Sequence, residues 1–395
     1  MTDTTSLDDF TATARSWLDA RLPKRDRSRR AWGEGDDDVS VFHDLTREEE
    51  SRLIAEASTY EQEKFDAGFG GITLPAEFGG RGLTHEHERA FRSVESAYRT
   101  PPSHELLTVT MVLVGNTIER LGTPEQKQRF LPALMSAREL CCQLFSEPGA
   151  GSDLASVSTR AVRDGDEWVI DGQKVWSSGA QYAQWGICLA RTNTDAPKHH
   201  GMTMFLVPLD AEGIDVRQIR QMSGGSTFNE VFLDGVRIDD SLRIGDVDGG
   251  WKVALTVLGF ERGGGENRGG TYFEVLALAR WLERTKDPIV RQRLATLYIQ
   301  RRQLAVTARR ARKGGPRAPH GSLVKLLYTQ HQRTISETAA DLLGPRLMAD
   351  TGEWGTFAWT TFVTGAPGNR IAGGTDETQR NILGERVLGL PRERS

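Results

Sequence analysis

Three places in the sequence combine residue types that could bind a ligand or move a proton. Residues 146–153 (SEPGAGSD) place hydroxyl and carboxylate side chains among glycines, and residues 176–178 (WSS) place two hydroxyls beside an indole. Glu261 lies near the apolar residues Leu258 and Phe260. Apolar surroundings raise the pKa of a carboxylate toward neutrality, where it can serve as a general base. Taken alone, residues 146–153 also fit a glycine-rich turn, and Glu261 also fits an ion pair with Arg262 or with a neighbouring helix.

Several common catalytic and nucleotide-binding patterns are absent from the sequence. It contains no Gly-x-Gly-x-x-Gly after a strand, no Walker P-loop and no Gly-x-Ser-x-Gly elbow. Its three cysteines, Cys141, Cys142 and Cys188, lack the number and spacing of a disulfide framework or a zinc site. A nucleotide cofactor would therefore have to be held by another fold.

The first third of the chain, which precedes these segments, is predicted to be helical. Ser6 and the pair Thr46 and Glu49 have the residue types and spacing of helix N-terminal caps. Residues 84–98 and 111–121 continue the helical pattern. Residues 122–125 (GTPE) then break the chain and begin a new helix with proline just inside its start.

The pattern of apolar residues changes near residue 140, where strand patterns replace helical ones. Residues 160–170 predict two strands around a tight turn at Asp164-Gly165, and a second turn is expected at Asp171-Gly172. Further strand-like runs cover residues 185–191, 202–208 and 228–233. Helical periodicity returns after residues 249–251 and continues to the C-terminus.

Length and charge set the broad class of the protein. A chain of 395 residues with this order of elements predicts an N-terminal α-helical domain (1–139), a middle β-domain (140–243) and a C-terminal helical domain (244–395). The net charge of −4 indicates no general attraction to nucleic acid or anionic membrane. No apolar run is long enough to span a bilayer, and the acidic N-terminus lacks a signal sequence, so we expect a cytoplasmic protein without a membrane span.

Seven short segments occur in the order in which one enzyme family carries them. They are residues 71–82, 121–132, 146–153, 171–179, 228–232, 249–251 and 373–386. Each segment is weak evidence alone, but together they make the sequence resemble the acyl-CoA dehydrogenase family over almost the whole chain.

The resemblance implies a fold, a cofactor and a reaction. The fold is mainly α with a β insert: an N-terminal α-helical domain, a middle β-barrel and a C-terminal four-helix bundle. FAD is expected between the last two domains and a neighbouring subunit. The reaction is α,β-dehydrogenation of an acyl-CoA thioester to a 2,3-enoyl-CoA, with electrons passed to an electron-transferring flavoprotein. The flavin supplies the redox chemistry, while the protein supplies positioning, a base and electrostatics.

The resemblance also assigns roles to single residues. Ser146 stands where a threonine usually contacts the flavin edge and keeps a hydroxyl there, while Glu377 stands where glutamine is common. The positions that match FAD contacts are Leu144, Ser146, Gly151, Ser152, Trp176, Ser177, Ser178, Thr375 and Glu377. The positions that match substrate contacts are Ser152, Arg262 and Gly374.

The expected catalytic base is where the sequence departs from the common family pattern. Most members carry a glutamate just before the C-terminal Gly-Thr pair, and that region here begins at Gly373. A minority of members place the glutamate before an arginine on the first long C-terminal helix, which is where Glu261-Arg262 stands. We therefore predict that Glu261 is the base and that the Gly373 N–H binds the thioester carbonyl as that oxygen gains negative charge.

Two further departures concern the subunits and the acyl group. The family's Arg-x-x-Phe and Gln-x-x-Gly-Gly patterns, which reach a neighbour's FAD, are missing around residues 282–287 and 342–345. The chain is therefore expected to pair with a related subunit or to form a homo-oligomer with altered FAD contacts. The glycine-rich residues 263–270 either leave room for a bulky or branched acyl group or form a loop that delays the next helix.

Two other functions remain open from the sequence. The same fold could support a flavin-dependent oxidase or monooxygenase. The chain could also be a non-catalytic partner subunit of a heteromeric acyl-CoA dehydrogenase, because the usual base is missing. The presence of both Glu261 and the Gly-Gly-Thr segment favours the dehydrogenase.

Overall fold

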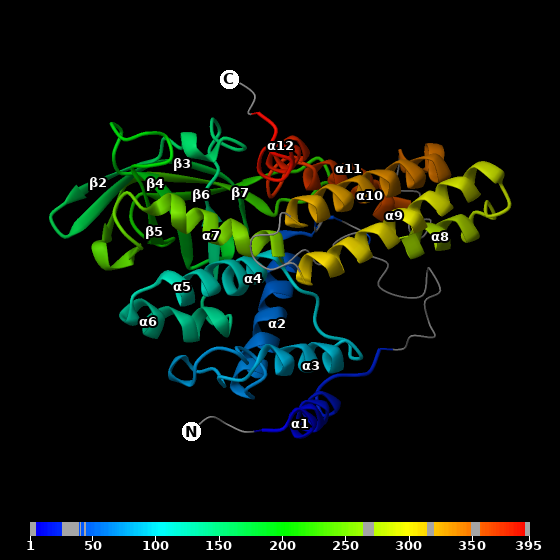
Figure 1. Ribbon diagram of the computed structural model, residues 1–395, viewed down its shortest axis with the longest axis horizontal. Coiled ribbons are helices and arrows are strands. Elements are labelled where there is room, and N and C mark those ends of the chain that lie inside the picture. The colour runs from blue at the N-terminus through cyan, green and yellow to red at the C-terminus, as the bar shows by residue number, and fades with distance from the viewer. Residues whose placement is uncertain are drawn as a thin grey trace. The chain divides into compact units, whose positions relative to one another are not determined.

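The computed structural model describes residues 5–25, 39, 41–42, 45–263, 272–313, 320–348 and 356–391. These residues belong to two compact units. The first comprises Met1–Arg27, Leu45–Ile219 and Ser226–Phe260, and the second comprises Ser28–Asp44, Arg220–Gly225 and Glu261–Ser395. Along the chain the elements follow the predicted order of helices, strands and helices (Figure 1), which confirms the predicted fold class.

The early helices begin where the capping patterns predict. Helix α1 (Leu7–Asp19) follows Ser6, whose hydroxyl accepts a hydrogen bond from the Asp9 N–H at 3.1 Å. Helix α2 (Arg47–Asp66) follows Thr46, which forms a reciprocal capping box with Glu49. Each cap satisfies backbone N–H groups that have no partner inside the helix.

The remaining helices of the first unit lead to the sheet. They are α3 (His85–Glu95), α4 (Glu105–Thr108), a π-helical segment (Val109–Gly115), α5 (Asn116–Leu121) and α6 (Pro124–Met135). Helix α6 has Pro124 at its start, as residues 122–125 predict, and Thr123 and Gln126 form a capping box there. The helical region that the sequence places at 111–121 begins earlier, at Glu105.

An eight-stranded sheet forms the middle of the chain. Its strands are β1 (Cys141–Leu144), β2 (Arg160–Asp164), β3 (Glu167–Ser178), β4 (Trp185–Arg191), β5 (Met202–Pro208), β6 (Ile214–Ile219), β7 (Phe228–Asp239) and β8 (Arg243–Ile244). The strand order is β6-β7-β3-β2-β4-β5-β8, and β1 pairs in parallel with β4. The predicted hairpin is confirmed, because β2 and β3 pair antiparallel up to Asp164 and Glu167.

The turn expected at Asp171-Gly172 is wrong. Strand β3 continues through these residues, and its pairing with β7 shifts register there instead of ending. A β-carbon at Gly172 would lie 2.4 Å from Thr159 Oγ1, so the glycine allows a close approach within a bulged strand. A second register shift lies between Lys174 and Ser177.

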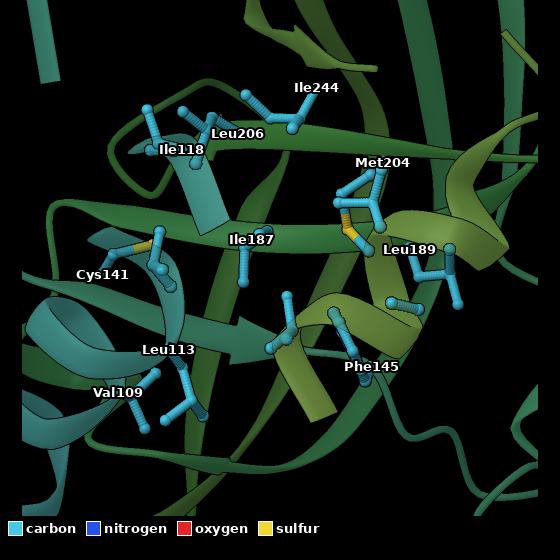
Figure 2. Close-up of a cluster of buried hydrophobic side chains, with 14 of the residues drawn as sticks. Val109, Leu113, Ile118, Cys141, Phe145, Ile187, Leu189, Met204, Leu206 and Ile244 are labelled. Carbon is cyan, nitrogen blue, oxygen red and sulfur yellow. The ribbon is translucent and has the colours of Figure 1, made fainter. Parts of the chain in front are cut away.

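The core of the first unit covers both faces of β4. Ile187 and Leu189 belong to one buried cluster, while Cys188 and Ala190 belong to another on the opposite face. Figure 2 shows the first cluster, to which the helical residues before the sheet and strands β1, β4, β5 and β8 contribute side chains. Phe145 packs into this cluster immediately after β1, so the core fixes the point from which residues 146–153 depart.

The second unit is helical. After α7 (Gly250–Gly263), which joins the two units, come α8 (Tyr272–Trp281), α9 (Pro288–Lys313), α10 (His320–Leu343), α11 (Thr356–Asn369) and α12 (Asp376–Arg386). Helix α10 packs against α8, α9, α11 and α12 (Figure 1) around a core that includes Leu297, Ile335 and Phe362. Of the glycine-rich residues 263–270, all but the first lie outside the described residues.

The helices of the described ranges include none with both the length and the apolar character needed to cross a membrane.

Candidate active site

A buried ion pair joins the two segments of the first unit that the sequence assigns to the flavin. Lys174 of β3 is 0% exposed, and its Nζ donates to Glu147 Oε1 at 2.8 Å and to the carbonyls of Phe145 (3.2 Å) and Leu189 (2.7 Å). All three ammonium donors thus have acceptors, which a buried lysine requires. The ion pair therefore holds the loop 146–153 against β3, the strand that carries Trp176.

Glu147 is equally well satisfied on its other side. It accepts hydrogen bonds from the N–H and hydroxyl of Ser158, both at 2.7 Å, and from the Thr159 N–H at 2.9 Å. Burial raises the pKa of Glu147, but the attraction of Lys174 and these hydrogen bonds outweigh it and lower the pKa to about 2. The carboxylate is therefore ionised at neutral pH.

Backbone hydrogen bonds complete the junction between the two segments. The Val175 N–H donates to the Ser146 carbonyl at 2.9 Å. Glu147 and Ala150 exchange two hydrogen bonds across a tight turn, at 3.1 and 3.0 Å. The structure therefore brings Ser146 directly beside the strand residues that lead into Trp176.

Trp176 is held in a conformation that a tryptophan rarely adopts. Its φ is +63°, in the left-handed region, and its side chain is 58% exposed and in edge contact with Phe228 at 6.0 Å. Such an outlier costs of order 1–3 kcal/mol and often marks a ligand site. The bulge in β3 makes this conformation possible and presents the indole at the surface of the first unit.

The other predicted flavin contacts of the first unit differ in what they can offer. Ser178 is half-buried, and Gly151 and Ser152 are exposed. Ser177 is only 1% exposed and Leu144 is 0% exposed, so their side chains face the core. Their roles as flavin contacts stay predictions, and in this structure such contacts would use the backbone.

The chain that leaves β3 is anchored from the first helices. Tyr182 Oη donates to Glu50 at 2.9 Å, and the ring of His104 lies 3.0 Å from the same carboxylate. The Gly179 N–H donates to the Thr227 carbonyl at 2.9 Å. These buried bonds fix the C-terminal end of the strand that holds Trp176 and Ser178.

The first unit therefore fits the flat, polar-edged ring of a flavin. The exposed indole of Trp176 offers an apolar surface. Ser178, two residues further along the strand, and Ser146, whose carbonyl is bonded to the Val175 N–H, offer hydroxyls. The buried Lys174–Glu147 ion pair keeps these groups in place. No nucleotide fingerprint is needed, because the residues come from a loop and a bulged strand.

In the second unit, a glycine turn precedes α12. Gly373 and Gly374 have φ of +65° and +87°, a region that favours glycine. The Gln379 amide donates to the Gly373 carbonyl at 3.1 Å, and Thr375 caps α12 by accepting from the Thr378 N–H at 3.1 Å. Within the described residues, the Gly373 N–H has no hydrogen-bond acceptor.

A buried aspartate ties this turn to the bundle. Asp376 accepts hydrogen bonds from Thr329 Oγ1 at 2.7 Å and from Arg370 Nε at 2.8 Å. Burial raises the pKa of Asp376, but Arg370 and Thr329 outweigh it and lower the pKa below the ordinary value. The turn is thus fixed on both sides of Gly373.

Glu261 occupies the space beside Gly373. A β-carbon built on Gly373 would lie 2.9 Å from Glu261 Oε1 and 3.8 Å from its Cδ. That approach is closer than a real β-carbon tolerates, so a side chain at position 373 and the present position of Glu261 exclude each other. The structure therefore brings together the two residues that the sequence predicts to be catalytic.

The remaining predicted residues of the second unit are less informative. Glu377 is exposed and pairs with Arg380 at 3.2 Å. The side chain of Arg262 lies outside the described residues. Their predicted contacts with FAD and substrate stay predictions.

Three residues of these sites, Glu147, Lys174 and Lys325, are not predicted from the sequence. Glu147 and Lys174 both lie inside segments that carry the family resemblance, 146–153 and 171–179, but no local pattern marks either of them. Their pairing spans 27 residues and could not be read locally. Lys325, whose Nζ would lie 3.6 Å from a β-carbon on Gly373, gave no signal in the sequence beyond being one lysine on a helix.

Sequence models of one family match three successive parts of the chain. "Acyl-CoA dehydrogenase, N-terminal domain" matches residues 46–138, "Acyl-CoA dehydrogenase, middle domain" matches 142–236, and "Acyl-CoA dehydrogenase, C-terminal domain" matches 248–388.

Individual proteins agree with these matches. The chain is 39% identical over 352 residues to "Acyl-CoA dehydrogenase IpdE1" of Mycobacterium tuberculosis, which covers 87% of this chain and 90% of that protein. A solved structure named "Tcur3481-Tcur3483 steroid ACAD" is 28% identical with a TM-score of 0.75, covering 98% of both chains. The ChsE4-ChsE5 complex from Mycobacterium tuberculosis is 25% identical with a TM-score of 0.74, covering 100% of both chains.

Proposed function

The chain belongs to the acyl-CoA dehydrogenase family, and from this premise we propose that Glu261 is the base that removes the α-proton of its acyl-CoA substrate. Membership makes the protein an FAD-dependent oxidoreductase, an acyl-CoA dehydrogenase. The proposal concerns which carboxylate acts, which acyl group is oxidised and which proteins take part.

The position of Glu261 against Gly373 carries the proposal. Position 373 has no side chain, and Glu261 Oε1 lies 2.9 Å from the place where a β-carbon would stand. A carboxylate is therefore present at the turn although the residue of the turn lacks one. This supports a base supplied by α7 and speaks against a non-catalytic subunit.

The residues of the chain would divide the work as follows. When bound, FAD would supply the acceptor for the β-hydrogen, and the product would be a 2,3-enoyl-CoA. Glu261 takes the α-proton on its carboxylate. The Gly373 N–H, which has no acceptor among the described residues, donates to the thioester oxygen as negative charge grows there. The acyl chain excludes water from the carboxylate and so raises its basicity.

We also propose a bulky or branched acyl group as the substrate. One of the similar structures is named "Tcur3481-Tcur3483 steroid ACAD".

The proposed partners are a related subunit and an electron-transferring flavoprotein. Two of the similar structures are named as pairs of unlike chains. The family patterns that reach a neighbour's FAD are missing at residues 282–287 and 342–345. A related subunit would supply those contacts, and a homo-oligomer is the alternative. A cytoplasmic location stays a prediction of the sequence.

The test compares wild type with Glu261→Gln under anaerobic conditions. Each purified protein is mixed with butyryl-, isovaleryl- and octanoyl-CoA and with a CoA thioester of a steroid side-chain acid, and flavin absorbance is followed. Wild type should bleach with at least one thioester, and the variant should bleach at least about 10³-fold more slowly while keeping its FAD. Glu283→Gln, at an exposed position of the same unit, is the control.

Retained bleaching in the Glu261→Gln variant would sink the assignment of the base. A wild-type protein whose reduced flavin consumes oxygen rapidly would instead favour the oxidase. A protein that takes up FAD only when co-expressed with a related subunit would support the heteromer, whereas an active homotetramer from this chain alone would exclude it.

A further inference from the structure

A lysine that the proposed mechanism does not use lies beside the catalytic turn. Lys325 is in the second turn of α10, and its Nζ donates to the Ala372 carbonyl at 2.6 Å. The same Nζ would lie 3.6 Å from a β-carbon on Gly373, to which Glu261 Oε1 also comes within 2.9 Å. The ammonium and the carboxylate therefore flank one glycine.

The environment of Lys325 couples the two charges. The lysine is half-buried; burial lowers its pKa, while the carboxylates of Glu261 and Asp376 act in the opposite direction. Attraction between unlike charges is mutual, so the ammonium favours the ionised form of Glu261 in return. Because the site is partly shielded from water, this attraction is screened less than at the surface.

The other charges near the turn are already engaged with each other. Asp376 is bound by Arg370, and Arg380 also attracts it. Glu377 pairs with Arg380. Among the residues that the structure describes, the charged groups with printed interactions around the turn are Arg370, next to α11, and Asp376, Glu377 and Arg380 of α12. Asp376 also attracts Lys325, so the comparison of Lys325→Gln with Lys325→Arg, which keeps the charge, measures what that charge contributes.

We propose that Lys325 is a positioning residue for Glu261: its ammonium fixes the Ala372–Gly373 turn and keeps the carboxylate ionised until the substrate's α-proton arrives. This inference rests on the proposed function of Glu261. Without the positive charge, the carboxylate would be a stronger base but would be protonated at a higher pH. The variant would therefore lose activity at acidic pH and recover it at alkaline pH.

The first experiment measures how the rate of flavin reduction depends on pH. Lys325→Gln removes the charge but keeps an N–H donor for the Ala372 carbonyl, and Lys325→Arg keeps both. Lys286→Gln, at an exposed position, is the matched control. With the acyl-CoA that reduces wild type fastest in the panel above, the acid limb of Lys325→Gln should move up by about one pH unit. Lys325→Arg and Lys286→Gln should keep the wild-type limb.

A purely structural role predicts something else. Loss of the turn alone would lower the rate of Lys325→Gln by the same factor at every pH, and that outcome would overturn the proposal. An unmoved limb in Lys325→Gln with a wild-type rate would overturn it as well. Activity in Glu261→Gln would instead remove the proposed function on which the inference rests, so the two failures are distinguishable.

A second measurement needs no substrate. The carboxyl carbon of Glu261 is followed by NMR in protein labelled with ¹³C at the glutamate side-chain carboxyl, and Glu261→Gln identifies its resonance. Its titration midpoint should be about one pH unit higher in Lys325→Gln than in wild type. If that variant does not fold, Lys325→Met takes its place in the same titration. Equal midpoints with and without the lysine charge would contradict the proposal.

Discussion

Two lysine–glutamate arrangements serve the two units in different ways. In the first unit, Lys174 is 0% exposed and its ammonium has three acceptors, one of them Glu147. In the second unit, Lys325 is half-buried and shares the neighbourhood of Gly373 with Glu261. In the first pair, every donor of the ammonium has an acceptor. The second pair lies beside Gly373, which has no side chain. The comparison shows that the Lys174–Glu147 pair stabilises the fold, whereas Glu261 beside Lys325 is placed to accept a proton.

The closed pair should be the more costly one to break. Lys174→Met leaves Glu147 buried and ionised without its partner, which costs about 3–5 kcal/mol of unfolding free energy. We expect a matching fall in stability in urea titrations and loss of bound FAD. Lys198→Met is the control, because the Lys198–Asp153 pair is 50% and 58% exposed and should contribute about 0–1 kcal/mol. Equal losses of unfolding free energy in the two variants would show that the buried ion pair contributes no more than the surface pair.

The open arrangement should be sensitive to a single methyl group. Gly373→Ala places a β-carbon 2.9 Å from Glu261 Oε1 and must displace the carboxylate. Displacing a catalytic base by about 1 Å can lower the rate roughly 10²-fold. We therefore expect kcat/KM to fall by at least that factor, with FAD still bound. Gly344→Ala has a similar φ of +54° but open space around the new methyl group, and it separates backbone strain from displacement. A wild-type rate for Gly373→Ala would mean that Glu261 is not held where the structure has it.

The closed pair should also set a limit on acid stability. The folded-state pKa of Glu147 is lowered from 4.5 to about 2, so its ionised form stabilises the fold above pH 4.5. This contribution should be lost as pH falls from about 4.5 through about 2. Urea unfolding at a series of pH values measures it, and Glu147→Gln should flatten that part of the curve. A wild-type curve as flat as that of the variant would contradict the account.

The smallest effect is expected at the cap of α12. The Thr375 hydroxyl accepts a hydrogen bond from the Thr378 N–H at 3.1 Å. Thr375→Ala should therefore reduce the free energy of unfolding by about 1 kcal/mol. Thr375→Ser keeps the hydroxyl and should retain stability. A larger loss of FAD than of stability in Thr375→Ala would support the predicted flavin contact, whereas unchanged FAD affinity would argue against it.

The sequence predicted the parts of this structure that depend on near neighbours. The capping box at Thr46, the helix start at Pro124 and the hairpin at Asp164 are set within four residues, and all three are confirmed. The turn expected at Asp171-Gly172 failed because the strand is held there by tertiary pairing with β7, which overrides the local turn preference of aspartate and glycine.

Long-range features of the sites could not be read in the same way. Ser177 is predicted beside Trp176 as a flavin contact, and alternation along the bulged strand turns its side chain into the core. The contact stays a prediction, but its geometry could not be read from the sequence. Lys325 and Gly373 are 48 residues apart, and only the packing of α10 against α12 brings the lysine to the turn. The proximity of Glu261 to Gly373 was anticipated only because the family resemblance supplied it.

Proton removal by Glu261 can be measured separately from hydride transfer. A 3-thia-acyl-CoA has sulfur in place of the β-carbon and so has no β-hydrogen to give, while its α-protons remain acidic. Incubated with wild-type enzyme in D₂O, it should gain deuterium at the α-position, as seen by mass spectrometry. Glu261→Gln with FAD bound should show exchange no faster than enzyme-free buffer. Exchange at the wild-type rate in that variant would show that another group removes the proton.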